Sequence, residues 1–152
     1  MRAWVPIVAV MALNLHATPA CGGPNESMTP DADTIAALEA RASQAQPREQ
    51  CYLYAQVVQQ MTELSIRQYA GGDAEKATSL LKQVQRIAQK IHLSLTDNDK
   101  RLKNAEILLG HTAFRLKEML HASSLEDRPL VEQTLAQVNE ARDEAMMEVF
   151  QK

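Results

Sequence analysis

KRLKNAEILLGHTAFRLKEMLH, residues 100–121, places apolar side chains along two sides of one predicted helix. At about 100° per residue, one stripe has the spacing of a helix that faces a protein core, and it consists of Leu102, Ala105, Leu109, Thr112, Leu116 and Leu120. A second, shorter line at i, i+3 and i+7 follows the opposite side and consists of Ile107, Gly110 and Phe114. Because such a helix must be covered from both sides, we predict that residues 100–121 form the central helix of the fold.

The second line needs a covering element. A glycine inside a helix costs roughly 1 kcal/mol relative to alanine, and an exposed Ile–Phe pair is a liability unless something packs on it. Gly110 would let that element approach closely. Two occupants are open, an N-terminal helix of the same chain or a second protomer or partner helix. We therefore take Ile107, Gly110 and Phe114 as a candidate interaction surface.

Four other segments have apolar residues at helical spacing. They are residues 31–45, 48–70 and 74–95 and a last helix that starts near Pro129. The most regular stripe, in residues 74–95, is Ala77, Leu80, Leu81, Val84, Ile87, Ala88, Ile91 and Leu95. Local signals mark the helix ends, namely Thr29-Pro30 at a start, Pro47 as the residue that ends or kinks the first helix, Gly71-Gly72 at an end, Asp73 as a cap, and residues 96–99 as cap candidates for the next helix.

No segment alternates polar and apolar residues as a half-buried strand does, so the predicted fold class is all-α. Short connections between long consecutive helices favour antiparallel neighbours. We predict an antiparallel up-down helical bundle of four long helices with a short N-terminal helix, formed as one domain by residues 29–152.

Residues 1–20 have the features of a signal peptide. Arg2 supplies a positive charge, residues 3–15 are apolar but too short to span a bilayer, and Thr18-Pro19-Ala20 places small residues before a cleavage site. Residues 21–28, CGGPNESM, are then a flexible linker. We expect an exported protein, located in the periplasm, in the extracellular medium or on a membrane as a lipoprotein.

Cys21 follows the expected cleavage site directly, and three states of this thiol are open. Lipidation would make Cys21 a membrane anchor, although bacterial lipoproteins usually have an aliphatic residue where Thr18 stands. Plain cleavage would leave a thiol, which could form a disulfide with Cys51, the other cysteine of the chain. Cys51 itself is predicted to be a small hydrophobic residue near the start of a helix.

Composition excludes several classes of function. Removal of Arg2 with the signal peptide leaves 15 Lys and Arg against 19 Asp and Glu, a net charge of −4, so we expect no binding to nucleic acid. The motifs of covalent haem, zinc proteases and phosphate loops are absent from the sequence. One Glu-x-x-His copy, Glu118 to His121, stands without the second copy that a di-iron bundle needs. We therefore expect no enzymatic activity and no cofactor or metal.

Lys82, Arg86 and Lys90 recur every fourth residue and form a candidate basic contact face, for which a solvated surface is the plainer interpretation. The sequence thus predicts a helical bundle that acts by binding an unidentified protein or by forming a homo-oligomer, without catalysis. The alternative is a bundle that holds a small ligand or a metal. A membrane would be reached only through a lipid anchor at Cys21.

Overall fold

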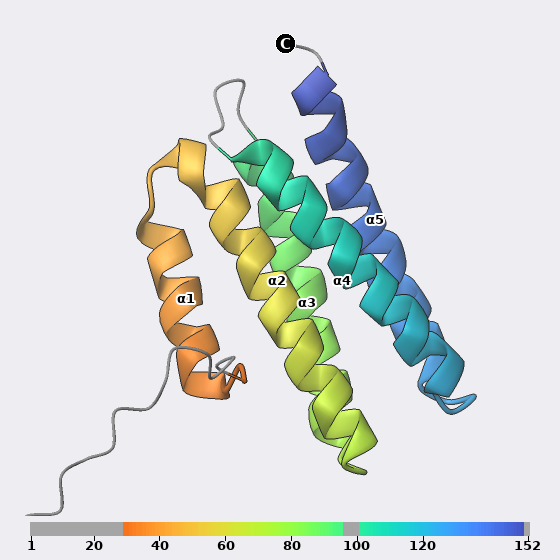
Figure 1. Cartoon of the computed structure of the whole chain (residues 1–152). Helices are drawn as coiled ribbons and strands as arrows, with labels where there is room; N and C mark the ends of the chain where they lie inside the picture. Colours follow the sequence, from red (N-terminus) through yellow and green to blue (C-terminus); the bar gives the residue numbers. More distant parts are fainter. Residues whose placement is uncertain (1–28, 96–100, 151–152) are drawn as a thin grey trace, which may run out of the picture.

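A computed structural model of the chain describes residues 29–95 and 101–150, and the secondary structure elements of this part are all helices (Figure 1). Its helices are α1 (Ala32–Gln44), α2 (Pro47–Ala70), α3 (Ala74–Ser94), α4 (Leu102–Ala122) and α5 (Arg128–Phe150). The all-α class is therefore confirmed. The predicted signal peptide, the linker, Cys21 and the cap candidates at 96–99 lie outside the described residues.

The helix ends follow the local signals closely. Pro47 is the first residue of α2, where its missing amide costs nothing, and Asp73 caps α3 by accepting a hydrogen bond from the Lys76 amide at 3.1 Å. Gly72 has a φ of +86°, which an L side chain rarely adopts, so a glycine is needed after α2. One boundary was predicted wrongly, because Asp31, and not Thr29, is the N-cap of α1.

Two helical hairpins build the bundle. The chain reverses direction from each long helix to the next, so α2 and α3 are antiparallel, as are α4 and α5 (Figure 1). The hairpins pack with α2 against α4 and α3 against α5, whereas α3 and α4 are not in contact within the described residues. These two contacts between hairpins join helices that run the same way. The expectation of antiparallel neighbours thus holds inside each hairpin but not between them.

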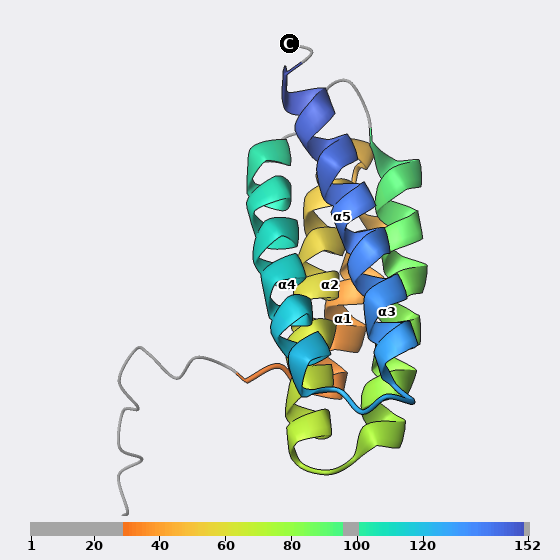
Figure 2. The same cartoon turned by 90° about the vertical axis from the view of Figure 1, so that its right-hand side faces the viewer.

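The central helix is α2, and not the predicted residues 100–121. It packs against α1, α3 and α4, and Figure 2 shows it behind α5, between α3 and α4. The buried surface of α2 is accordingly wider than its predicted stripe and also includes Leu53, Ala55 and Thr62. The sequence did not show that so much of α2 is buried, because glutamines stand between these residues. In the structure Gln56, Gln59 and Gln60 are half-buried and not solvent-exposed.

The core otherwise contains the residues that the stripes predicted. On α3, Leu81, Val84, Ile87 and Ile91 have no exposed surface, and on α5 the same is true of Val131, Val138 and Ala145. Five of the six stripe positions of α4 are buried, and the sixth, Leu120, is partly buried. The described helices include none that is apolar over a length sufficient to cross a bilayer.

Helix α1 does not cover the second line of α4. It packs on α2 through Ile35 and Ala42, on the side away from α5 (Figures 1 and 2). Glu39 of α1 forms ion pairs with Arg86 and Lys90 of α3, and the N–O distance is 3.2 Å in each. The intramolecular explanation of the Ile107–Phe114 line is therefore wrong, since α1 has contacts with α2 and ion pairs with α3 instead.

Candidate functional site

The outer side of α4 carries a stripe of residues that is exposed except at Gly110, where the Arg142 side chain of α5 lies over it. Spacings of four and three residues alternate along it, as at the a and d positions of a heptad. We define the outer α4 stripe as Lys103, Ile107, Gly110, Phe114, Lys117 and His121. Ile107 is 57% exposed and Phe114 is 59% exposed, among the largest exposed apolar groups of the described chain.

Gly110 admits the side chain of Arg142 from α5. A Cβ atom at position 110 would lie 3.3 Å from Arg142 Nε, a distance tighter than an ordinary van der Waals contact. The guanidinium crosses α4 at this point and donates from Nε to Glu106 at 3.0 Å. The glycine is therefore explained inside the chain. The group that approaches it is the Arg142 side chain, whereas the sequence led us to expect a helix, either the N-terminal helix of the same chain or one from a partner.

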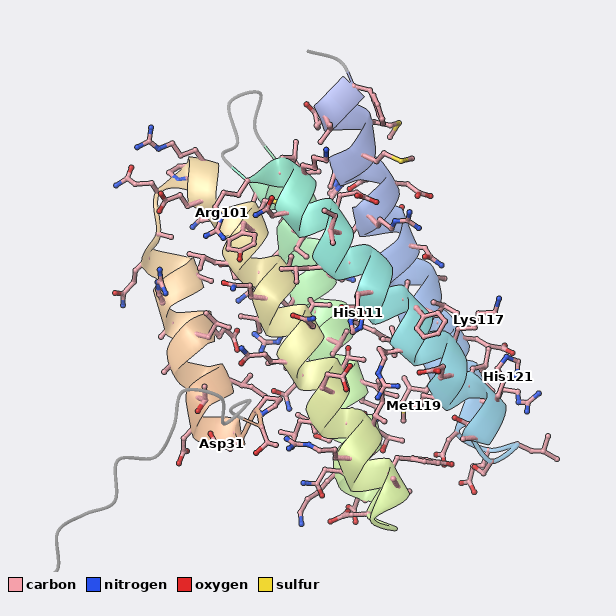
Figure 3. The ribbon with its side chains drawn as sticks, viewed as in Figure 1. Asp31, Arg101, His111, Lys117, Met119 and His121 are labelled. Atoms are coloured by element: carbon pink, nitrogen blue, oxygen red, sulfur yellow. The ribbon has the colours of Figure 1, made fainter. Side chains whose placement is uncertain are left out.

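A groove with a volume of about 450 Å³ runs along the seam between α4 and α5, beside Phe114. Gly110, Ala113 and Leu120 line it from α4, and Leu135, Asn139 and Arg142 line it from α5. Lys117 and His121 stand at its rim, and both lie on the α5 side of α4 (Figure 3). The α4–α5 groove is therefore mainly apolar, with basic residues along one edge.

The carboxylates of α4 are both neutralised inside the chain. Glu106 pairs with Arg142, and Glu118 pairs with Arg115, which also binds Glu63 of α2 at 2.9 Å. Hydrogen bonds to Glu63 and Glu118 raise the pKa of Arg115 above its ordinary value. The outer α4 stripe itself contains no acidic residue, so its ionisable groups are all basic.

The outer side of α5 has the opposite charge. We define the outer α5 stripe as Glu132, Ala136, Asp143, Met147 and Phe150, which are all exposed. Met147 is 54% exposed and Phe150 is 80% exposed. The α4 and α5 stripes together form the outer α4–α5 face, basic on α4 and mainly acidic on α5, where the exposed Arg128 one turn before Glu132 is the exception, and apolar between the charges. The sequence indicates that the acidic residues of this last helix could pair with basic residues inside the fold or between copies, but it does not reveal the exposed apolar residues Met147 and Phe150 beside them.

The candidate basic face of α3 is largely used inside the fold. Arg86 and Lys90 pair with Glu39, and the Lys90 ammonium also lies 5.5 Å from the centre of the Tyr54 ring. Lys82 is exposed and has no ion pair within the described residues. A single unpaired lysine makes a weak contact surface, so the structure favours the plainer interpretation of this line.

A second groove lies between α3 and α5 and was not anticipated. The small residues Ala88 and Ala141 leave room at its floor, and His92 Nδ1 contacts Glu144 at 2.8 Å at its edge. The Glu144 carboxylate, through this hydrogen bond and its charge, raises the pKa of His92. The signal was present in the sequence as a histidine at the end of one helix, but its acidic partner lies 52 residues away.

The candidate metal ligands are not brought together. Glu118 is held by Arg115, and His111 and His121 are exposed on α4 (Figure 3). The described residues contain no group of three or more His, Cys, Asp or Glu side chains that could hold a metal ion. Cys51 is buried at the start of α2 with 1% of its surface exposed, as predicted for a small hydrophobic residue.

Comparison of the chain with protein-family models, with curated proteins and with solved structures found no match.

Proposed function

We propose that this protein is a non-catalytic binding protein that docks another protein chain on its outer α4–α5 face. The observation that carries the proposal is the exposure of Ile107 and Phe114, 57% and 59%, at heptad-like spacing on a helix whose other side is core. Full burial of such a side chain contributes about 1.5–3 kcal/mol, so a partner that covered both would gain on the order of 2 kcal/mol from them.

The rest of the face fits a protein partner better than a small ligand. The α4–α5 groove is shallow and open along its length, and protein interfaces typically combine an apolar centre with a charged rim of this kind. The rival function, a ligand or metal held in the bundle core, has no supporting observation within the described residues. Aliphatic side chains from all four long helices fill that core.

The same proposal includes export, on the features of residues 1–20 alone. The mature chain would begin at Cys21, and intact mass of the protein recovered from its producing cells measures this. An added diacylglyceryl mass would select the lipid anchor. A chain that still carries Met1 contradicts the proposed processing.

Site-specific photo-crosslinking in the producing cells tests the docking face. A photoreactive phenylalanine analogue placed at Phe114 should give a discrete protein adduct, identified by mass spectrometry. The matched control is the same analogue at Leu93, which is 82% exposed on α3 and lies off the outer α4–α5 face. An adduct at 93 but none at 114, at equal expression and melting temperature, would contradict the proposed docking face.

A further inference from the structure

We propose that the occupant of the outer α4–α5 face is a second copy of this chain, in a two-fold dimer whose axis runs parallel to α4 and α5. The inference rests on the proposed function, because it names the partner for the same face. In this dimer α4 of each copy lies against α5 of the other. Three observations support it, namely the charges of the two stripes, their heights along the bundle and the size of the face.

The face carries its own complementary charge. Lys103, Lys117 and His121 supply the basic side, whereas Glu132 and Asp143 supply the acidic side. None of these five side chains has an ion pair within 4 Å among the described residues, although other charges of α4 and α5 are paired. Their pairing therefore remains available to an incoming surface of opposite charge, and the same face of a second copy is such a surface.

The heights of these residues match across a parallel two-fold axis. The short loop between Ala122 at the end of α4 and Arg128 at the start of α5 sets these two residues at about the same height, which places position 108 of α4 about level with position 142 of antiparallel α5, and the contacts of the Arg142 side chain with Glu106 and Gly110 agree with this register. Because both helices rise by the same amount per residue, position 117 is level with 133 and position 121 with 129. Glu132 therefore lies between the heights of Lys117 and His121.

Rotation about an axis parallel to the helices keeps every height and exchanges α4 with α5. Lys117 and His121 of one copy then face Glu132 of the second copy, and the same contact occurs twice. Position 114 is level with 136, so the exposed Phe114 ring faces the small Ala136 of the second copy. A large side chain opposite a small one is the arrangement that lets two helix surfaces interdigitate.

The charges of the face also favour the two-fold axis parallel to α4 and α5 over the other two-fold axis that brings the same face together. An axis perpendicular to the helices within the interface would lay α4 on α4, antiparallel, so that the outer α4 stripe, which has no acidic residue, would face its own copy. It would likewise lay the acidic α5 on the acidic α5. Like charges placed opposite one another disfavour that dimer, whereas the parallel axis pairs each basic stripe with an acidic one.

The face is large enough for a stable dimer at the lower end of the usual range. With 21 residues in α4, the helix is about 31 Å long, and two adjacent helices are about 20 Å wide. The flat area is therefore about 600 Å² per copy, against about 600–1,000 Å² per partner in standard interfaces. We expect a dimer of moderate affinity that weakens at high salt.

Charge reversal tests the pairing in the purified full chain by sedimentation equilibrium. Lys117→Glu places two glutamates opposite each other at both contacts, and Glu132→Lys does the same with lysines. Each variant alone should weaken the dimer about tenfold or more. An equimolar mixture of the two should form a heterodimer, because every contact then pairs Glu with Lys or Lys with Glu. Lys82→Glu, the matched charge change on exposed α3, should leave the dimer unchanged.

Circular dichroism separates lost dimerisation from lost folding, and the mixture provides a second check, since an unfolded variant could not be rescued by the other. A wild-type chain that stays monomeric at about 100 μM overturns the inference, as does a dimer that neither single variant weakens. Either result would leave the proposed function, the docking of another protein on this face, unaffected. An adduct from position 114 to a different protein would keep the docking face and exclude the second copy, whereas no adduct at all would remove both.

Discussion

Replacement of Gly110 by alanine should fail to give the stability gain that a mid-helix glycine normally predicts. In an exposed helix, Gly→Ala contributes about 0.8–1.0 kcal/mol because it removes backbone freedom from the unfolded chain. Here the new Cβ would lie 3.3 Å from Arg142 Nε, so the guanidinium must shift by a few tenths of an ångström, and this shift weakens the bond from Nε to Glu106. That ion pair is partly exposed, at 38% and 21% of the two side chains, and is worth about 0.5–1 kcal/mol. The two effects should nearly cancel.

A double-mutant cycle isolates this contact. Gly110→Ala should change the free energy of unfolding by less than about 0.3 kcal/mol in the wild-type background and raise it by about 1 kcal/mol in the Arg142→Ala background. Urea denaturation, performed at one protein concentration below the range of self-association, measures all four proteins. Equal gains in both backgrounds would refute the reasoning, because Arg142 would then not be the reason for the glycine.

Three other substitutions test the core, the closed end of the bundle and a surface pair. Ile87→Ala should lower the free energy of unfolding by about 2–5 kcal/mol in chemical denaturation, because Ile87 is fully buried. If it lowers this free energy no more than the exposed Lys82→Ala does, Ile87 does not face the core. Tyr69→Phe should cost about 1–2 kcal/mol, measured the same way, since its hydroxyl bonds the α4–α5 loop at 2.8 and 3.0 Å, and an unchanged midpoint would show that these bonds are replaced by water. The pKa of His92, raised by Glu144, should fall toward its ordinary value in Glu144→Gln, as NMR titration would show. Since the pKa of His92 is raised in the folded protein, its pair with Glu144 stabilises the fold fully below the ordinary histidine pKa and no longer does so once the pH rises above the raised value. A stability difference between the wild-type protein and Glu144→Gln that does not change with pH would contradict this.

Much of the local structure was predictable because helix periodicity and capping act over three or four residues. The stripe around Ile87, the end of α2 before Gly71 and the cap at Asp73 all follow from such local signals, and the structure confirms them. The exposure of Phe114 was not predicted, since the sequence led us to expect that the second line is covered, whereas Phe114 is 59% exposed. The spacing of residues on α4 could not show this, because it depends on where α1 docks.

The fold class, the helix segments and the inward side of each helix thus follow from local patterns of residues. The central place of α2, the contacts between helices that run in the same direction, and the position of Arg142 over Gly110 instead depend on how the helices pack together. The pairing of Glu39 with Arg86 and Lys90 belongs to the same group, since these residues are 47 and 51 positions apart. Periodicity is set by the geometry of one helix, whereas the packing arrangement depends on how well the surfaces of several helices fit one another. Many inward-facing stripes are compatible with more than one neighbour, and long-range packing selects among them.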